Sequence, residues 1–343
     1  MPAKSETQEY VREGLPYDIL KAVYKDSRAS LRELGRSLNI SYHNIASTLE
    51  ELGSRYKLEY TLEIDEKALG FAEGRLITIK FEKSPSIDFL KERLAKDIFV
   101  QDAYLGEGDF NLLLYVVATT AKEIKSEIWK LRTDFAEYKP IFKSATLDEN
   151  AIGFLPLKSE LINESPMLSN SEKKVLMLLN DNSRIRLKDI CIKCRIKNPM
   201  HVVYIIRKLK EKGIIRKFTA LTQNPDKRVF AASSVSLIPT KEHGKFFLNF
   251  ARAIISEDTK EITNDYCFIA DTIGAYDGFY ICTFTDGEQM AKRGPDLLQL
   301  LWAAENPQIE KTVLTYRITG KWPFHLEEYT NYKALVEKNA SKT

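Results

Sequence analysis

Hydrophobic positions in residues 16–52 recur at the spacing of an α-helix in three short stretches. Ser30 with Glu33 forms a capping-box pattern at the start of the second stretch, and Ser41 is an N-cap candidate for the third. Three short amphipathic helices of this kind can close a small core. The positions that carry the pattern are Ile19, Leu20 and Val23, then Leu31, Leu34 and Leu38, then Ile45, Leu49 and Leu52.

Farther along the chain the period changes to the alternation typical of β-strands. The order strand, helix, strand, strand, helix, strand is expected twice. The first set of ranges is 74–82, 86–96, 98–105, 109–118, 120–134 and 137–147. The second is 227–238, 241–256, 261–273, 277–285, 286–304 and 307–317. This order predicts the split βαβ arrangement of ferredoxin-like domains.

The chain also matches itself. Asp26-Ser27-Arg28 and the apolar positions around it return as Asn182-Ser183-Arg184, 156 residues later, and the third helical stretch returns at an offset of 157. A Gly-x-x-Asp hairpin turn at 106–110 matches the segment 274–278 at an offset of 168. In the second copy, Asn198 followed by Pro199 marks the same helix start. These matches predict a tandem duplication.

The predicted fold class is therefore α+β, with two repeats that each join a winged helix-turn-helix to a ferredoxin-like βαββαβ domain. The expected units are helix-turn-helix 1 (16–63), sensing domain 1 (74–147), a linker (148–170), helix-turn-helix 2 (171–222), sensing domain 2 (227–320) and a C-terminal tail helix (321–343). A total of 343 residues suits two or more cores.

Composition narrows the class of protein. Hydrophobic residues at 44% and charged residues at 29% are typical of a globular protein, and no apolar run approaches the length of a membrane span. Four cysteines give no disulfide framework. We therefore expect a cytoplasmic protein without a membrane partner. Cys191 and Cys194 lack a second ligand pair at metal spacing, so small buried apolar positions are favoured over a zinc site.

The formal net charge of +3 conceals an uneven distribution. Residues 181–217 hold 12 Lys and Arg against three acids, a net charge of +9, whereas the matching window 25–61 has a net charge of +1. A dense basic cluster on a helix-turn-helix is what phosphate neutralisation requires, although such a run is also typical of a solvated helix face. The second copy is thus expected to contact double-stranded DNA more strongly than the first.

In a winged helix-turn-helix, the third helix presents its N-terminal side chains to the base edges in the major groove. The candidate DNA-binding residues therefore lie around that helix in both copies. In the second copy they are Lys193, Arg195, Lys197, Asn198, Met200, His201, Tyr204, Arg207 and Lys208, and in the first Ser41, Tyr42, His43, Asn44 and Ser47.

The duplicated Asp/Asn-Ser-Arg pattern, the Ser41-started helix and the Gly-x-x-Asp turn resemble the Lrp/AsnC family of prokaryotic and archaeal transcription regulators. The resemblance implies dimerisation through the sheets, which a tandem chain would achieve as an intramolecular pseudo-dimer. It also implies a small effector, such as an amino acid, at the turns, with candidate residues Gly106, Asp109, Gly274, Tyr276 and Asp277. Simple hairpin chemistry, with Gly at positive φ and Asp in an Asx turn, accounts for the same pattern without a ligand.

No catalytic motif was found in the sequence, so the expectation is a transcription regulator that is not an enzyme and carries no cofactor. Two alternatives remain open. Fused Lrp-like chains also resemble siroheme decarboxylases of alternative haem biosynthesis, whose tetrapyrrole site is expected to combine His and Arg, but His243 and His325 match no such segment. The other alternative is a non-catalytic interaction module.

Overall fold

A computed structural model describes residues 15–71, 73–222, 229–236, 266–284 and 308–321, with three single residues between 288 and 291. The first helix-turn-helix consists of α1 (Leu15–Lys25), α2 (Leu31–Leu38), α3 (Tyr42–Tyr56) and strand β1 (Leu58–Ile64). The second consists of α7 (Asn170–Asp181), α8 (Leu187–Cys194), α9 (Pro199–Glu211) and strand β6 (Ile215–Thr222). Among the described helices, none is both long and apolar enough to cross a membrane.

The helix starts expected from the sequence are confirmed. Ser30 and Glu33 form a reciprocal capping box at α2. The Ser41 hydroxyl accepts a hydrogen bond from the amide of Asn44 at 3.2 Å, and the Asn198 side chain accepts one from the amide of Met200 at 2.9 Å. Because each cap satisfies a backbone donor that the helix leaves free, local chemistry alone determines where these helices begin.

Eight strands form a closed barrel in the order β10-β3-β4-β2-β5-β8-β9-β7. The first half contributes β2 (Glu73–Phe81), β3 (Val100–Gly108), β4 (Leu112–Ala118) and β5 (Pro140–Ile152). The second contributes β7 (Val229–Ser236), β8 (Tyr266–Gly274), β9 (Gly278–Phe284) and β10 (Gln308–Thr319). Within each half the strand order is that of a ferredoxin-like sheet, and the α+β class is confirmed. The expected helices at 241–256, 286–304 and 321–343 lie almost wholly outside the described residues.

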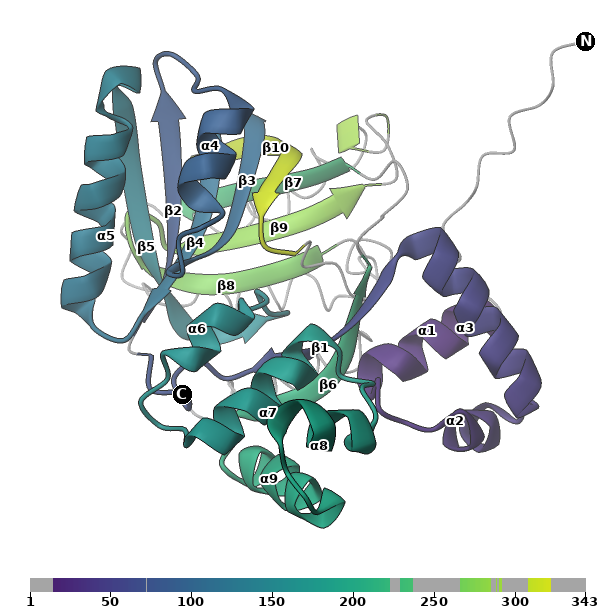
Figure 1. The fold of residues 1–343 in the computed structure, drawn as a ribbon. Coiled ribbons are helices and arrows are strands. Elements are labelled where there is room, and N and C mark those ends of the chain that lie inside the picture. The colour runs from purple at the N-terminus through teal and green to yellow at the C-terminus, as the bar shows by residue number, and fades with distance from the viewer. Residues whose placement is uncertain are drawn as a thin grey trace, which may run out of the picture.

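Two apolar clusters hold the barrel and its covering helices, and a third forms the core of the first helix-turn-helix. One cluster fills the barrel interior and continues into the second helix-turn-helix; its barrel members include Leu76, Leu113, Phe230 and Phe279. The other joins the outer face of the first half's strands to α4 (Ile87–Leu94) and α5 (Ala121–Asp134). Figure 1 shows α4 and α5 on this outer face, with the two helix-turn-helix units beside each other below the barrel.

The segment 148–170 differs from the expected linker. Strand β5 continues to Ile152, and α6 (Ser159–Asn163) packs against α7 before the second helix-turn-helix begins. Leu161 and Ile162 are fully buried. Since apolar side chains of this segment join the core, the segment is part of the fold, which its Pro, Ser and Asn content did not indicate.

The match between the two hairpin turns also needs correction. Gly108 pairs with Thr312 of β10 and has φ +155°, and Gly274 pairs with Ala145 of β5 and has φ +139°. These two glycines therefore occupy equivalent positions in the two halves. Leu105 pairs with Leu112 in one hairpin as Asp271 pairs with Gly278 in the other, so the equivalent positions are 166 residues apart rather than 168. The offset of 168 matched Gly106 with Gly274 because both are glycine, although the backbone pairing makes Gly108 the equivalent of Gly274.

Contacts between the two helix-turn-helix units repeat across the halves. Strands β1 and β6 pair antiparallel, with Thr61 opposite Thr219. The hydroxyl of Thr61 donates to the carbonyl of Asn180 at 2.8 Å, and that of Thr219 donates to the carbonyl of Tyr24 at 2.8 Å. Tyr24 and Asn180 are 156 residues apart, which is the offset of the sequence match. Each contact therefore has a counterpart in the other half.

The Asp/Asn-Ser-Arg motifs meet at the centre of this contact. The Ser27 and Ser183 hydroxyls hydrogen-bond at 2.5 Å, and both serines are fully buried. The Arg28 guanidinium donates to the carbonyl of Ser183 at 2.6 Å and to that of Ile185 at 3.3 Å. Arg184 makes a single longer bond, 3.5 Å, to the carbonyl of Ala29. The motif thus joins the two halves.

Replacing Arg28 with Ala should lower the free energy of unfolding by about 1.5–3 kcal/mol, because charged hydrogen bonds to half-buried carbonyls are lost. Arg184→Ala is the matched control, since its one 3.5 Å bond predicts a smaller loss. Urea denaturation of both variants measures the difference. Equal losses, or none, would contradict the importance assigned to the Arg28 bonds.

Candidate functional site

A cavity of about 390 Å³ opens where the first half of the barrel, α6, α7 and the end of β10 meet. Three lysines and three carboxylates line it, together with backbone and amide groups. The lining residues are Ala95, Lys96, Asp97, Ile98, Gln101, Pro156, Leu157, Lys158, Ser159, Glu160, Asn180, Asp181, Thr319, Gly320 and Lys321. Its volume lies at the lower end of the range for ligand sites, ~300–1,000 Å³.

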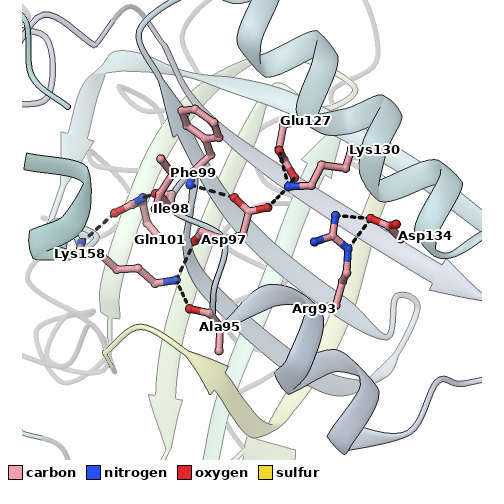
Figure 2. A network of polar contacts seen from close by, with 10 residues as sticks. All are labelled: Arg93, Ala95, Asp97, Ile98, Phe99, Gln101, Glu127, Lys130, Asp134 and Lys158. Carbon is pink, nitrogen blue, oxygen red and sulfur yellow. Dashed lines mark hydrogen bonds and ion pairs between the residues drawn. The ribbon is translucent and has the colours of Figure 1, made fainter. Parts of the chain in front are cut away.

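Lys158 is held in this cavity by the segment between α4 and β3. Its Nζ donates to the carbonyls of Ala95 at 3.3 Å and Asp97 at 3.1 Å, and its amide donates to Oε1 of Gln101 at 2.8 Å (Figure 2). Burial lowers the pKa of Lys158, while the charges of Asp102 and Asp97 oppose that shift. A partly desolvated ammonium is well placed to bind an anion.

The wall behind Lys158 is braced by ion pairs. Asp97 accepts from the amide of Phe99 at 3.0 Å and pairs with Lys130, which also reaches Glu127 at 3.2 Å (Figure 2). Because Lys130 neutralises Asp97, the carboxylates that face the cavity without that pairing are Glu160 and Asp181. These contacts fix the loop that leads into β3, the strand that carries Gln101.

Asp102 is fully buried directly behind the cavity wall. Its Oδ1 accepts from the amide of Lys321 at 3.0 Å and from the Tyr104 hydroxyl at 3.3 Å. Its Oδ2 has no hydrogen-bond partner within the described part of the chain. A Cβ at Gly320 would come within 1.9 Å of Oδ1, so the close approach of β10 requires glycine there. Burial raises the pKa of Asp102 to about 7, against the charges of Lys158 and Arg317.

A second acid lies on the other side of Tyr115. Tyr115 stands directly opposite Asp102 in the β3–β4 pairing, and its hydroxyl donates to Oε1 of Glu66, just after β1. Burial raises the pKa of Glu66 to about 7, opposed by the Tyr115 hydrogen bond and the charge of Arg216. Burial, together with the charge of Glu66, raises the pKa of Tyr115 well above its usual value. An acid with a perturbed pKa directly behind a cavity, as Asp102 is, is typical of functional sites.

Among the described strands, the facing pair Asp102 and Tyr115 has no polar equivalent in the other half of the barrel. At the offset of 166, the second half has Phe268 where the first has Asp102, and Ile281 where the first has Tyr115. Both are buried and apolar. Since the backbone is the same in both halves, the acids are not needed to form the sheet. They had not been predicted, although an Asp and a Tyr inside otherwise apolar strands are a signal that the sequence contains.

The candidate DNA-binding residues of the second helix-turn-helix come together on one exposed surface at the start of α9. Met200 is 67% exposed and Tyr204 is 49% exposed. The ring of His201 stacks near Tyr204, with centroids 6.3 Å apart. Arg207 pairs with Glu211 at 3.5 Å and Lys208 with Glu172 at 2.8 Å. The remaining candidates there, all exposed, are Lys193, Arg195, Lys197 and Asn198.

The first helix-turn-helix presents its candidates in the same way. Ser41, Tyr42, His43, Asn44 and Ser47 are exposed at the start of α3, and the Tyr42 and His43 rings lie 3.8 Å apart. Cys191 and Cys194 are half-buried on α8 and pack against the core. A role of these surfaces in DNA binding stays a prediction.

Gly106, Asp109, Gly274 and Tyr276 lie at contacts between the two halves, and Asp277 bonds within the second half; none of the five lines the cavity. Oδ2 of Asp109 accepts from the amide of Lys311 at 2.7 Å. Tyr276 is buried, with its hydroxyl bonded to Thr78, and the amide of Asp277 donates to the carbonyl of Val235 at 2.9 Å. Gly106 and Gly274 lie against the backbones of β10 and β5. Gly274 has a positive φ as the hairpin interpretation expects, but Gly106 does not, and Asp109 bonds to β10 rather than within its own turn. A ligand role for these residues stays a prediction.

No protein-family model matches the chain. A stretch of 54 residues is 41% identical to the HTH-type transcriptional regulator LrpC of Bacillus subtilis (strain 168). This match covers 16% of the chain and 38% of LrpC, so the chain spans about two fifths of that relative. It supports a resemblance to Lrp/AsnC proteins for part of the sequence.

Solved structures match over nearly the whole chain. The siroheme decarboxylase NirDL matches with a TM-score of 0.57 and 14% identity, covering 95% of this chain and 99% of that one. NirDL in co-complex with an iron-uroporphyrin III analogue gives a TM-score of 0.58 and 14% identity, covering 94% and 98%. At 14% identity, this structural likeness shows a shared fold and nothing beyond the fold. The expectation that the chain is not an enzyme is wrong, because its whole-chain counterpart is an enzyme.

Proposed function

We propose that the chain is a decarboxylase that removes CO2 from carboxylate side chains of an iron tetrapyrrole of the siroheme class. The observation that carries the proposal is Asp102, a buried carboxyl with a raised pKa directly behind a lysine-lined cavity. The whole-chain likeness to NirDL supports it. The absence of an equivalent acid at Phe268 favours a single such site within the described barrel.

The chemistry follows from the residues. A substrate carboxylate beside Lys158 loses CO2 when its C–C bond breaks, and the electron pair left on carbon takes up a proton. Asp102, whose pKa is about 7, is protonated in about half of the molecules at neutral pH. It lies behind the cavity wall, so it would supply the proton through the Tyr104 hydroxyl, which contacts both Asp102 and the carbonyl of Lys321 in that wall. The ammonium groups of Lys96, Lys158 and Lys321 suit a ligand with several carboxylates. The cavity of about 390 Å³ would receive a carboxylate-bearing edge of the ring.

We also infer that the chain is a tandem duplication folded as an intramolecular pseudo-dimer. The support is the pairing of β1 with β6 and the repeated contacts of Thr61 and Thr219. In this arrangement the two halves contribute unequally to the proposed site, because the buried Asp102 belongs to the first. A cytoplasmic location stays an expectation.

Incubation of the full-length protein with siroheme under anaerobic, reducing conditions tests the activity. Mass spectrometry should detect products that have lost one CO2 per converted carboxyl group, in proportion to enzyme and time. Lys158→Gln should raise KM, because the ammonium group proposed to bind a substrate carboxylate is lost. Bound siroheme that never changes mass would overturn the proposal.

DNA binding is a second candidate function, favoured by the exposed cations between α8 and α9. No ion pair joins Lys193, Arg195 or Lys197 to another residue in the described ranges. Contacts with phosphates release counterions, so affinity for duplex DNA should fall steeply with salt. The partial identity with LrpC supports the same candidate.

Replacing both Lys193 and Lys197 with Ala should reduce the log–log salt slope of duplex binding by about two, one for each phosphate contact removed. Arg207→Ala with Lys208→Ala is the matched control and should change the slope less, because both side chains are already in ion pairs. Fluorescence anisotropy at several salt concentrations provides the measurement. A flat slope for the unaltered protein would eliminate this candidate.

A further inference from the structure

Gln101 is a fully buried residue whose side-chain amide joins two separate segments of the cavity wall (Figure 2). Its Nε2 donates to the carbonyl of Ile98 at 2.6 Å, and its Oε1 accepts from the amide of Lys158 at 2.8 Å. The first bond reaches the loop between α4 and β3, and the second reaches the residue that precedes α6. Both polar atoms of this amide are therefore bonded to backbone groups, which fixes its orientation.

A β-bulge turns Gln101 toward the cavity. The pairing of β3 with β4 shifts register between Val100 and Asp102, which makes Gln101 an extra residue in β3. Val100 and Ala103 both pack in the outer apolar cluster, although strict alternation would place them on opposite faces of the sheet. The extra residue accounts for this arrangement. Bulges that re-aim one side chain in this way are common next to active sites.

The bulge is repeated in the second half of the barrel, where the pairing of β8 with β9 shifts register between Tyr266 and Phe268. The residue between them in the sequence is Cys267 instead of glutamine. Because both halves have the bulge, the bulge belongs to the fold and does not require an amide. The glutamine occurs only in the half that has the cavity lined by Lys158, which points to a role in that site.

The two Gln101 bonds hold Lys158 at both ends of its side chain. One bond holds the Lys158 backbone amide, and the other holds the loop whose carbonyls receive its Nζ. Those carbonyls belong to Ala95, at 3.3 Å, and to Asp97, at 3.1 Å. In the described residues they account for the hydrogen bonds of Nζ, so one of its three protons is left for a ligand. An ammonium already held in place loses little further rotamer freedom when it binds an anion.

We infer that Gln101 is a positioning residue, which holds the Lys158 ammonium where it binds a carboxylate of the substrate. This inference rests on the proposed function. Gln101 acts through Lys158, and the step that it assists is binding, in which a carboxylate oxygen accepts the remaining ammonium proton as a hydrogen bond. Loss of Gln101 should therefore weaken the binding of a tetrapyrrole carboxylate and leave the chemical step unchanged.

A double-mutant cycle tests the coupling, with uroporphyrin III, an iron-free tetrapyrrole that carries several carboxylates, as the probe. Its Kd is measured by fluorescence quenching. Gln101→Met keeps the length of the side chain and removes both hydrogen bonds. It should raise Kd at least about tenfold in the otherwise unaltered protein, but less than about twofold in Lys158→Gln, which lacks the ammonium that Gln101 positions. Equal increases in the two backgrounds would overturn the inference.

Two further variants separate positioning from a general loss of stability. Thr219→Val is the matched control, because Thr219 is fully buried and its hydroxyl donates to the carbonyl of Tyr24, away from the cavity. It should lower stability in urea and leave Kd within about twofold. Gln101→Asn keeps the amide but is one methylene shorter, so it cannot span Ile98 and Lys158. As the milder change, it serves in the same cycle if Gln101→Met does not fold, and it should show the same dependence on Lys158.

Steady-state decarboxylation of siroheme provides the second readout. Gln101→Met should raise KM and leave kcat within about twofold, because only binding is weakened. A lower kcat with unchanged KM would contradict the positioning role. Coupling in the uroporphyrin III cycle, in a protein that never decarboxylates siroheme, would support the positioning of Lys158 and reject the proposed reaction. Decarboxylation together with an additive cycle, or with no binding of uroporphyrin III, would support the reaction and overturn the inference.

Discussion

Replacing Asp102 with Asn should lower kcat for decarboxylation by about 10²- to 10⁴-fold, the usual contribution of a positioned general acid. Asn has nearly the same shape and can still accept from the amide of Lys321, so the fold should persist. It cannot donate an acidic proton to the carbon that loses CO2. KM should change little, because Lys158 and the other cavity lysines remain.

The pH dependence of kcat tests the same variant in a second way. In the unaltered protein, kcat should fall as pH rises through about 7, because the reaction requires the protonated form of Asp102. The residual rate of Asp102→Asn should lose that dependence. Asp88→Asn, on the exposed start of α4, is a matched control and should behave like the unaltered protein. A full rate in Asp102→Asn would eliminate the proposed role of this carboxyl.

The free energy of unfolding should also depend on Asp102. Burial raises its pKa in the folded protein from 3.8 to about 7, so between those values the folded state binds more protons than the unfolded state. Stability contributed by this group is therefore complete below pH 3.8 and declines as pH rises toward 7. Asp102→Asn removes the titration, so its stability relative to the unaltered protein should improve over this window by at most about 4 kcal/mol.

Urea denaturation of both proteins at pH 5 and pH 8 measures the change. Glu172 does not affect the comparison between pH 5 and pH 8. Lys208 and the Ser169 backbone amide lower the pKa of Glu172 to about 2, although burial opposes that shift, so Glu172 is ionised in the folded protein at both pH values. Its contribution is present above its unfolded pKa and is lost as pH falls toward 2. A difference between the proteins that is the same at both pH values would mean that Asp102 does not titrate in this range.

Local sequence signals predicted much of the fold correctly. Ser30, Ser41 and Asn198 start helices, and the strand order follows alternation in the chain. These features depend on neighbours within a few residues, which is why they can be read without tertiary information. The linker was misjudged because burial of Leu161 and Ile162 depends on elements distant in sequence.

The candidate site was harder to predict for the same reason. The sequence carries no catalytic motif that marks these residues, because Glu66, Asp102 and Tyr115 come from different elements. Lys158 lies in a segment expected to be a linker, and it reaches the cavity through hydrogen bonds to the segment that follows α4. Burial, which raises the pKa of both acids, is a property of the folded molecule.

Periodicity and caps alone established two helix-turn-helix units, two ferredoxin-like units, and a basic cluster in the second copy. Chain folding decided that Ser27 meets Ser183, that the hairpins correspond at an offset of 166 rather than 168, and that one barrel half encloses Asp102 behind a lysine-lined cavity. The physical reason is range: propensity and capping act over one helical turn, whereas strand pairing and desolvation depend on residues far apart in the chain.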